Sequence, residues 1–213
     1  MKKALMLCGG WSGHKPEEFA NRLQKTLAPV GLEIEIASSL DVLNDVGVLG
    51  GYDVIIPNWT MGTLESEQVK NLVGAVRGGV GLAGIHGGMG DAFRGQTDYE
   101  WMVGGHFVGH PHVGEYTVRV ADMSSPITQG LPPTFAYHSE QYYLLVDPGN
   151  HVLADSLYSY EGRECVMPIA WTKEWGTGRV FYSSLGHDPR EFDEFPDSLK
   201  LATQGIQWAA RLL

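Results

Sequence analysis

The sequence predicts an α/β fold in which a mostly parallel sheet carries helices on both faces. In the first half of the chain, short apolar runs typical of strands alternate with segments of helical periodicity. The second half is richer in strand-like runs, which predict added antiparallel strands. The 213 residues, of which 43% are hydrophobic, are enough for a sizeable core, so we expect a single domain over residues 1–213.

The predicted elements of the first half have recognisable boundaries. A helix from Pro16 carries apolar residues four apart and is expected to end at Gly31. A second helix follows Thr63 and ends before Gly78. Four strands are predicted at residues 3–8 (KALMLC), 32–37 (LEIEIA), 52–59 (YDVIIPNW) and 80–85 (VGLAGI).

The second half is predicted to add strands and one closing helix. Residues 175–178 (WGTG) are typical of a hairpin turn, and a final helix with apolar residues at helical spacing begins at about Asp197. The strands are predicted at residues 115–120 (EYTVRV), 151–156 (HVLADS), 168–174 (PIAWTKE) and 179–184 (RVFYSS).

The composition of the chain disfavours several classes of function. A formal net charge of -10 disfavours nucleic-acid binding, which needs clustered Lys and Arg. No apolar run approaches the roughly 18 residues that span a bilayer, so no membrane partner is expected. Cys8 and Cys165 are too few for a disulfide framework or a cysteine-rich zinc site, and no leader pattern opens the chain. We expect a cytoplasmic protein with a small-molecule partner, and the sequence leaves a homo-oligomer open.

The stretch Gly84-Ile85-His86-Gly87-Gly88 has the spacing of a nucleophile elbow, with histidine in the nucleophile position. Glycines on both sides allow a strained turn that lifts the side chain clear of the sheet and points backbone N–H groups at a ligand. His86 as an ordinary polar residue at a strand end is the alternative, and the spacing alone leaves both open.

Several ordered motifs give the chain a resemblance to the ThuA-like family, named from trehalose utilisation. They are GGWSGH, WTMG, GIHGGMGDAFR, GGHFVGHP, SPITQGLP, SEQYY and WGTGRVFYSSLGHD. The resemblance implies the flavodoxin-like fold of class I glutamine amidotransferases, with the elbow after the fourth strand. It places His86 where those enzymes carry a cysteine and His187 where their partner histidine lies. Without a thiol at the elbow no thioester forms, so we do not expect a glutaminase.

Histidines are expected to build the site. His14, His86, His110, His138 and His187 are predicted to lie in loops, and His14 and His187 are expected to converge on His86. His110 falls on the family's F..HP pattern, whereas His106 and His112 are expected at the surface. A divalent metal such as zinc is left open as a cofactor, with His14, His110 and His187 as its candidate ligands.

Glu140 lies in an aromatic setting, where burial is expected to raise its pKa into the range useful for acid–base work. The predicted catalytic groups are therefore His86, Glu140 and His187. Asp91 and Arg94 are expected either to bind a polyol or to form a structural ion pair. The predicted substrate-binding residues are His14, Trp59, Asp91, Arg94, His110, Gln141 and Tyr142.

These residues predict acid–base chemistry, metal-assisted or not, on a sugar or keto-glycoside. A keto sugar has an acidified proton beside its carbonyl, so a hydrolase, lyase or isomerase can act without a nucleophile. Two alternatives stay open at this point, namely a non-catalytic sugar-binding module and an amidotransferase-like scaffold subunit.

Overall fold

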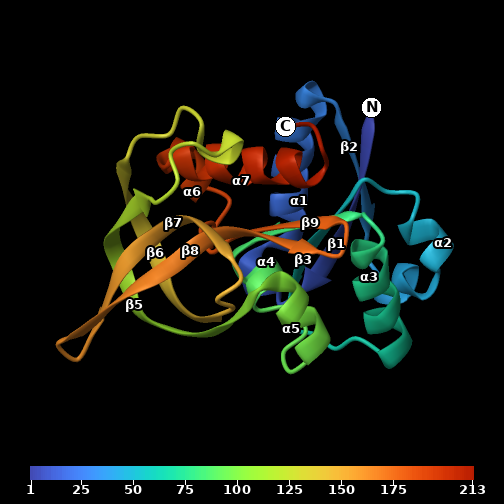
Figure 1. The fold of residues 1–213 in the computed structure, drawn as a ribbon, viewed down its shortest axis with the longest axis horizontal. Coiled ribbons are helices and arrows are strands. Elements are labelled where there is room, and N and C mark those ends of the chain that lie inside the picture. The colour runs from blue at the N-terminus through green and yellow to red at the C-terminus, as the bar shows by residue number, and fades with distance from the viewer.

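The computed structural model describes residues 1–213 and contains one sheet of nine strands, ordered β2-β1-β3-β4-β9-β8-β7-β5-β6 (Figure 1). The strands are β1 (Lys2–Gly10), β2 (Leu32–Ala37), β3 (Val54–Thr60), β4 (Gly81–Ile85), β5 (Gly105–Val120), β6 (Thr134–Val146), β7 (His151–Tyr160), β8 (Arg163–Trp175) and β9 (Gly178–Ser183).

The sheet has a parallel part and an antiparallel part that meet at β9. Strands β2, β1, β3, β4 and β9 pair in parallel, so their carboxyl ends lie along one edge. Strand β9 pairs in parallel with β4 but antiparallel with β8, to which a tight turn at Gly176 joins it. The sheet therefore continues beyond β9 as the antiparallel strands β8, β7, β5 and β6, as the strand-rich second half predicts.

Helices cover both faces of the parallel part (Figure 1). They are α1 (Pro16–Leu27), α2 (Val46–Leu49), α3 (Ser66–Arg77), α4 (His86–Gly90), α5 (Thr97–Val103), α6 (Glu191–Glu194) and α7 (Pro196–Ala209). Helices α1 and α7 pack in a cluster of 26 buried residues, and α3 and α5 pack in a second cluster of 25. The two clusters, almost equal in size, cover opposite faces of the central strands. Burial on both faces explains why the sequences of these strands are continuously apolar.

Three sequence predictions need correction. Helix α1 ends at Leu27 and is followed by a 3-10 turn, so Gly31 ends that turn and not the helix. Strand β6 was not predicted, because its run TFAYHSEQYYLLV mixes polar and aromatic residues. His110 and His138 consequently lie in strands β5 and β6 and not in loops.

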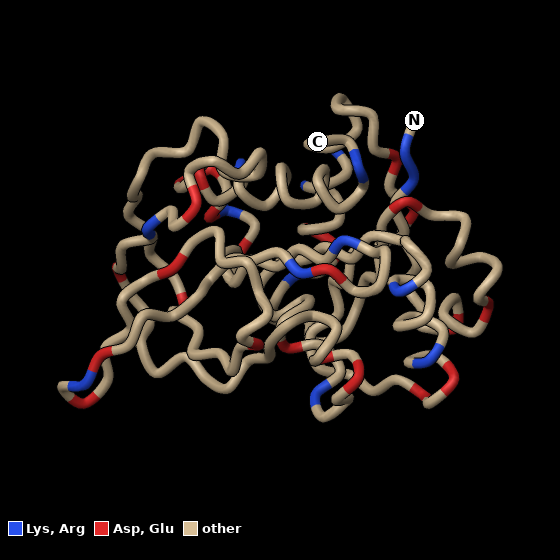
Figure 2. The backbone as a smooth tube through the Cα atoms, viewed as in Figure 1, with Lys and Arg blue, Asp and Glu red and all other residues tan.

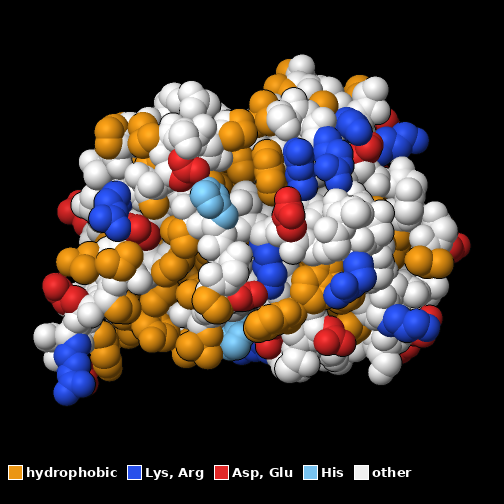
Figure 3. All heavy atoms as spheres, viewed as in Figure 1, with side chains coloured by type: hydrophobic (Ala, Val, Ile, Leu, Met, Phe, Trp, Pro, Cys, Tyr) orange, Lys and Arg blue, Asp and Glu red, His pale blue; other side chains and the backbone are white.

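Acidic residues outnumber basic ones, at 25 to 15. Figure 2 shows Lys and Arg spread along the chain among the acidic residues, in keeping with the net charge of -10. Hydrophobic side chains gather on the lower left of the view in Figure 3, over the antiparallel part of the sheet. The exposed hydrophobic residues of the antiparallel strands include Val108, Val113, Leu157, Tyr160 and Val166. None of the helices has the length and apolar character needed to cross a membrane.

Candidate functional site

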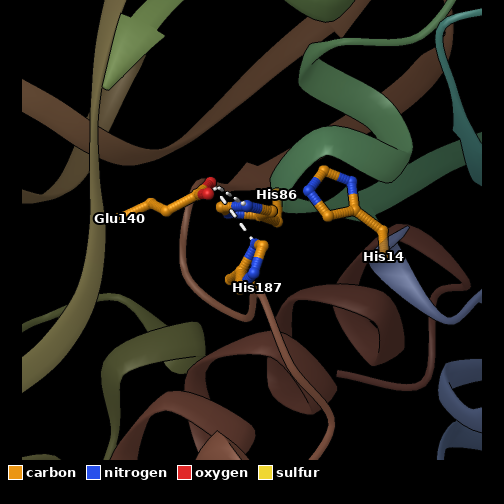
Figure 4. A group of neighbouring side chains, drawn as sticks. All are labelled: His14, His86, Glu140 and His187. Carbon is orange, nitrogen blue, oxygen red and sulfur yellow. Dashed lines mark hydrogen bonds and ion pairs between the residues drawn. The ribbon is translucent and has the colours of Figure 1, made fainter. Parts of the chain in front are cut away.

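Three histidines meet at the carboxyl ends of three parallel strands. His14 lies in the 3-10 turn that follows β1, His86 is the first residue of α4 after β4, and His187 lies in the loop after β9. Their ring centroids are 4.9 Å apart for His14 and His86, 5.0 Å for His14 and His187, and 5.3 Å for His86 and His187 (Figure 4). The convergence predicted from the sequence is confirmed by this geometry.

Glu140 reaches the histidines from the antiparallel strand β6. Its Oε2 atom lies 3.2 Å from Nε2 of His86 and 3.3 Å from Nδ1 of His187 (Figure 4). Its Oε1 atom lies 3.5 Å from Nε2 of His110. The ligand atoms of His14, His86, Glu140 and His187 all lie within 4.8 Å of one another. We call these four residues the histidine cluster.

The turn at His86 is strained, as the elbow-like spacing predicts. His86 has a φ of 43°, which is the left-handed region that non-glycine residues rarely occupy. A Cβ atom at Gly87 would collide with the ring of His14, so glycine is needed there for His14 to approach the turn. The glycine after the turn therefore shapes the cluster as well as the backbone.

The outer ring nitrogens of two histidines are held by neighbours. Nδ1 of His86 lies 2.8 Å from the carbonyl oxygen of Ser184, and Nδ1 of His14 lies 2.7 Å from Oγ1 of Thr60. A carbonyl oxygen only accepts, so Nδ1 of His86 carries a proton and its Nε2 faces Glu140. A neutral imidazole has no second N–H, so the contact between Nε2 and the carboxylate requires a proton or a cation between them.

Burial and mutual contacts shift the pKa values in the cluster. Burial alone would raise the pKa of Glu140, but its contacts with His187 and His86 outweigh burial and hold that pKa well below its usual range. The expected rise is therefore wrong. Burial, with the neighbouring His86 and His187, lowers the pKa of His14 to about 3, so His14 is neutral near pH 7. Contact with Glu140 raises the pKa of His187, although Nδ1 of His187 lacks hydrogen-bond geometry to any partner.

Two further predicted residues lie against the cluster. The buried ring of Tyr142 is 4.1 Å from the ring of His86, centroid to centroid. His110 lies at the more open side, with 39% of its side chain exposed, and 30% of the His187 side chain is exposed as well. Trp11, 47% exposed, places its indole 4.8 Å from the ring of His14. The exposed rings of Trp11, His110 and His187 form the more open side of the cluster.

Asp91 and Arg94 form the ion pair that the sequence left as one of two alternatives. Both nitrogens of the guanidinium edge bind the carboxylate, at 2.5 and 2.8 Å, and Asp91 is 4% exposed. The Arg94 side chain is 55% exposed.

Gln141 and Trp59 point away from the cluster. Successive side chains of a strand alternate between faces, so Gln141 faces away from Glu140 and Tyr142. It donates to Ser156 and to the carbonyl of Leu157, and it lines a cavity of about 550 Å³ that contains no member of the cluster. The indole of Trp59 fills the space over Gly9 and Gly62, which have no room for a side chain.

Sequence reasoning missed one buried acid beside the cluster. Glu191 accepts hydrogen bonds from Tyr137, Ser139 and the backbone of His187, and it is 9% exposed. Its signal in the sequence is weak, since it appears among the charged residues of HDPREFDE, which are typical of a solvated helix start. Neither cysteine is placed to act as a nucleophile in the histidine cluster. Cys8 is buried within β1, and Cys165 is exposed on β8.

The family model described as "Trehalose utilisation", ThuA, matches residues 3–209. The chain belongs to the ThuA family. Membership of the ThuA family gives it a carbohydrate-related role.

Solved structures share the ThuA fold at low sequence identity. A ThuA-like protein from Bacteroides uniformis ATCC 8492 is 18% identical with a TM-score of 0.80, covering 98% of this chain and 91% of that one. A ThuA-like protein from Parabacteroides merdae ATCC 43184 is 17% identical with a TM-score of 0.79, covering 98% and 90%. A cytoplasmic protein from Salmonella typhimurium is 12% identical with a TM-score of 0.67, covering 98% and 99%. No match was found among curated proteins.

Proposed function

We propose that this ThuA-family protein is an enzyme that acts by acid–base chemistry on a sugar or keto-glycoside, as a hydrolase, lyase or isomerase. The observation that carries the proposal is the histidine cluster. It gathers three imidazoles and a carboxylate at the edge of the sheet where ligand sites of parallel sheets form. The family's carbohydrate-related role supplies the substrate class.

His187 is the proton donor in this proposal. Contact with Glu140 raises the pKa of its imidazole, which favours the protonated form, and its side chain is 30% exposed. It is thus placed to protonate an oxygen that departs from a sugar.

The pair of His86 and Glu140 is the proton acceptor. Nδ1 of His86 is held by Ser184, so a proton arrives at Nε2, 3.2 Å from the ionised Glu140. That proton supplies the N–H that the contact with the carboxylate requires, and the resulting charge-assisted hydrogen bond stabilises the protonated pair. His110 and Tyr142 border this pair and are proposed to contact substrate, as is the exposed guanidinium edge of Arg94 beside Asp91.

The histidine cluster also has the donor chemistry of a divalent-metal site. Zinc with bonds of about 2.0–2.1 Å in a tetrahedron places its ligands roughly 3.3–3.4 Å apart. The contacts of Glu140 with His86 and His187, at 3.2 and 3.3 Å, match that spacing, while the widest separation of 4.8 Å requires a small inward movement. A histidine that binds a metal through one ring nitrogen typically bonds to a neighbouring group through the other. The Nδ1 atoms of His14 and His86 make such contacts, with Thr60 and Ser184. A zinc ion there would polarise a substrate carbonyl.

A flavodoxin-like core, related to that of class I glutamine amidotransferases, is part of the proposal. The parallel strands lie in the order β2-β1-β3-β4-β9, which is the flavodoxin-like order 2-1-3-4-5 when β9 counts as the fifth strand. The strained turn at His86 follows the fourth strand, as the elbow of those enzymes does. A cytoplasmic location and self-association through the exposed apolar region of the antiparallel strands stay predictions.

The deciding experiment is a turnover assay of the purified protein with 3-keto glycosides, run before and after removal of metal by a chelator. Product formation that depends on His187 supports the proposal, and His106→Asn is the matched control, because His106 contacts Glu100 and not the cluster. Saturable binding without product would indicate a sugar-binding module, and a stable complex with another protein and no turnover would indicate a scaffold subunit. Loss of turnover on chelation and recovery with zinc would assign the metal-assisted form.

A further inference from the structure

We propose that Glu191 is a positioning residue that holds His187 at its working distance from Glu140. This inference rests on the proposed function, because it concerns the same cluster. Glu191 begins the short helix α6, and its carboxylate is buried although it carries no ion-pair partner among the basic side chains.

Both oxygens of the Glu191 carboxylate are occupied by donors from two distant segments. Oε2 accepts from the Tyr137 hydroxyl at 2.5 Å and from the backbone N–H of His187 at 3.0 Å. Oε1 accepts from the Ser139 hydroxyl at 2.8 Å. The carboxylate therefore ties the loop that carries His187 to the part of β6 that carries Glu140.

The sheet itself does not make this connection. Strand β9, which leads to His187, and strand β6, which carries Glu140, are separated in the sheet by β8, β7 and β5. No ladder of backbone hydrogen bonds links the two segments, so their distance depends on side chains that bridge them. Glu191 is one such bridge, since it bonds to Ser139, the neighbour of Glu140 on β6, and to the backbone of His187.

The loop before α6 depends on the same network. The Tyr137 hydroxyl, while donating to Glu191, accepts from the N–H of Gly186 at 2.9 Å. Two successive backbone N–H groups, those of Gly186 and His187, are thus fixed by one pair of side chains. Nδ1 of His187 has no hydrogen-bond partner of its own, so the position of the ring toward Glu140 follows from the held backbone.

The test compares Glu191→Gln with Asp193→Asn. The first keeps the size of the side chain but places an amide N–H₂, a donor, among three donors. The second neutralises a carboxylate of the same helix that pairs with Arg22 and is 66% exposed, outside the network. Each variant is checked for folding by circular dichroism, then its His187 imidazole ¹⁵N chemical shifts are measured by NMR on chelator-treated protein, and its kcat and KM are measured with the keto glycoside.

We expect Glu191→Gln to shift the His187 ring signals and to lower kcat about 10–100-fold, the range typical of lost outer contacts in such sites, with KM changed less than threefold. Asp193→Asn should change neither. Unchanged His187 signals in folded Glu191→Gln overturn the inference. If Glu191→Gln does not fold, Ser139→Ala, which removes one bond to Oε1, is expected to shift the same signals, and unchanged signals overturn the inference there.

The two proposals fail separately. If the wild-type protein turns over no keto sugar, the proposed function fails, and the ring signals of His187 still decide whether Glu191 positions it. If turnover is found but folded Glu191→Gln keeps both the wild-type ring signals and the wild-type kcat, the positioning role fails and the proposed function stands.

Discussion

Replacement of His86 by asparagine separates a catalytic role from a packing role. Asparagine tolerates the left-handed backbone better than most residues, so the φ of 43° at this position adds little strain to the variant. The change removes the Nε2 atom that lies 3.2 Å from Glu140 and the ring that packs against Tyr142.

The magnitudes follow from these contacts. Loss of a positioned acid–base group costs roughly a hundred- to ten-thousand-fold in rate, and we expect kcat to fall within that range. Stability also falls by about 1–3 kcal/mol, because the ring that packs against Tyr142 is lost, whereas the asparagine amide N–H₂ takes the place of Nδ1 as donor to the carbonyl of Ser184. In a protein of this size each kcal/mol corresponds to roughly 2–4 °C, so the melting temperature should drop by about 2–12 °C.

The assay measures specific activity toward a 3-keto glycoside well below the melting transition, with His106→Asn as the control. A folded His86→Asn protein that retains activity within threefold of wild type, while melting at a lower temperature, would show that His86 only packs. The catalytic assignment of His86 would then be refuted, and Glu140 and His187 would need another proton acceptor.

Three other outcomes are expected. Joint replacement of Cys8 and Cys165 by alanine should leave turnover intact, because neither thiol lies in the cluster, and loss of activity in a folded variant would restore thiol chemistry. Glu140→Gln should lower the raised pKa of His187 in metal-free protein, so that the imidazolium loses its proton at a lower pH than in the wild type. An NMR titration curve of His187 that does not change would contradict the contact with Glu140. The hydrogen bond from Lys173 lowers the pKa of Asp147 in the folded protein. The pair therefore stabilises the fold at pH values above the unfolded pKa of about 3.9, and this stabilisation is lost as the pH falls through the lower folded pKa. Asp147→Asn should therefore lower the free energy of unfolding at pH 7 by about 1 kcal/mol or less in urea titrations and remove that pH dependence.

Much of the parallel half could be predicted because its signals are local. Apolar runs, helical spacing and turn glycines lie within a few residues of one another, so β1, β3, β4 and α3 appear close to their predicted ranges. The spacing of glycines around His86 likewise predicted a strained turn, which the φ of 43° confirms. Strand β6 was missed because its sequence shows no clean alternation, and its pairing with β5 is a contact between distant segments.

The sequence by itself determined the alternation of strands and helices, the family and the histidines that follow the parallel strands. Only the tertiary structure decided that Glu140 lies between His86 and His187, which reverses the pKa shift expected from burial. Only the tertiary structure joined Glu191 to His187 and β6. The physical reason is that strand and turn preferences act between near neighbours in the chain. The electrostatics of a site depend instead on which side chains from distant segments lie within a few ångströms of one another in the low-dielectric interior.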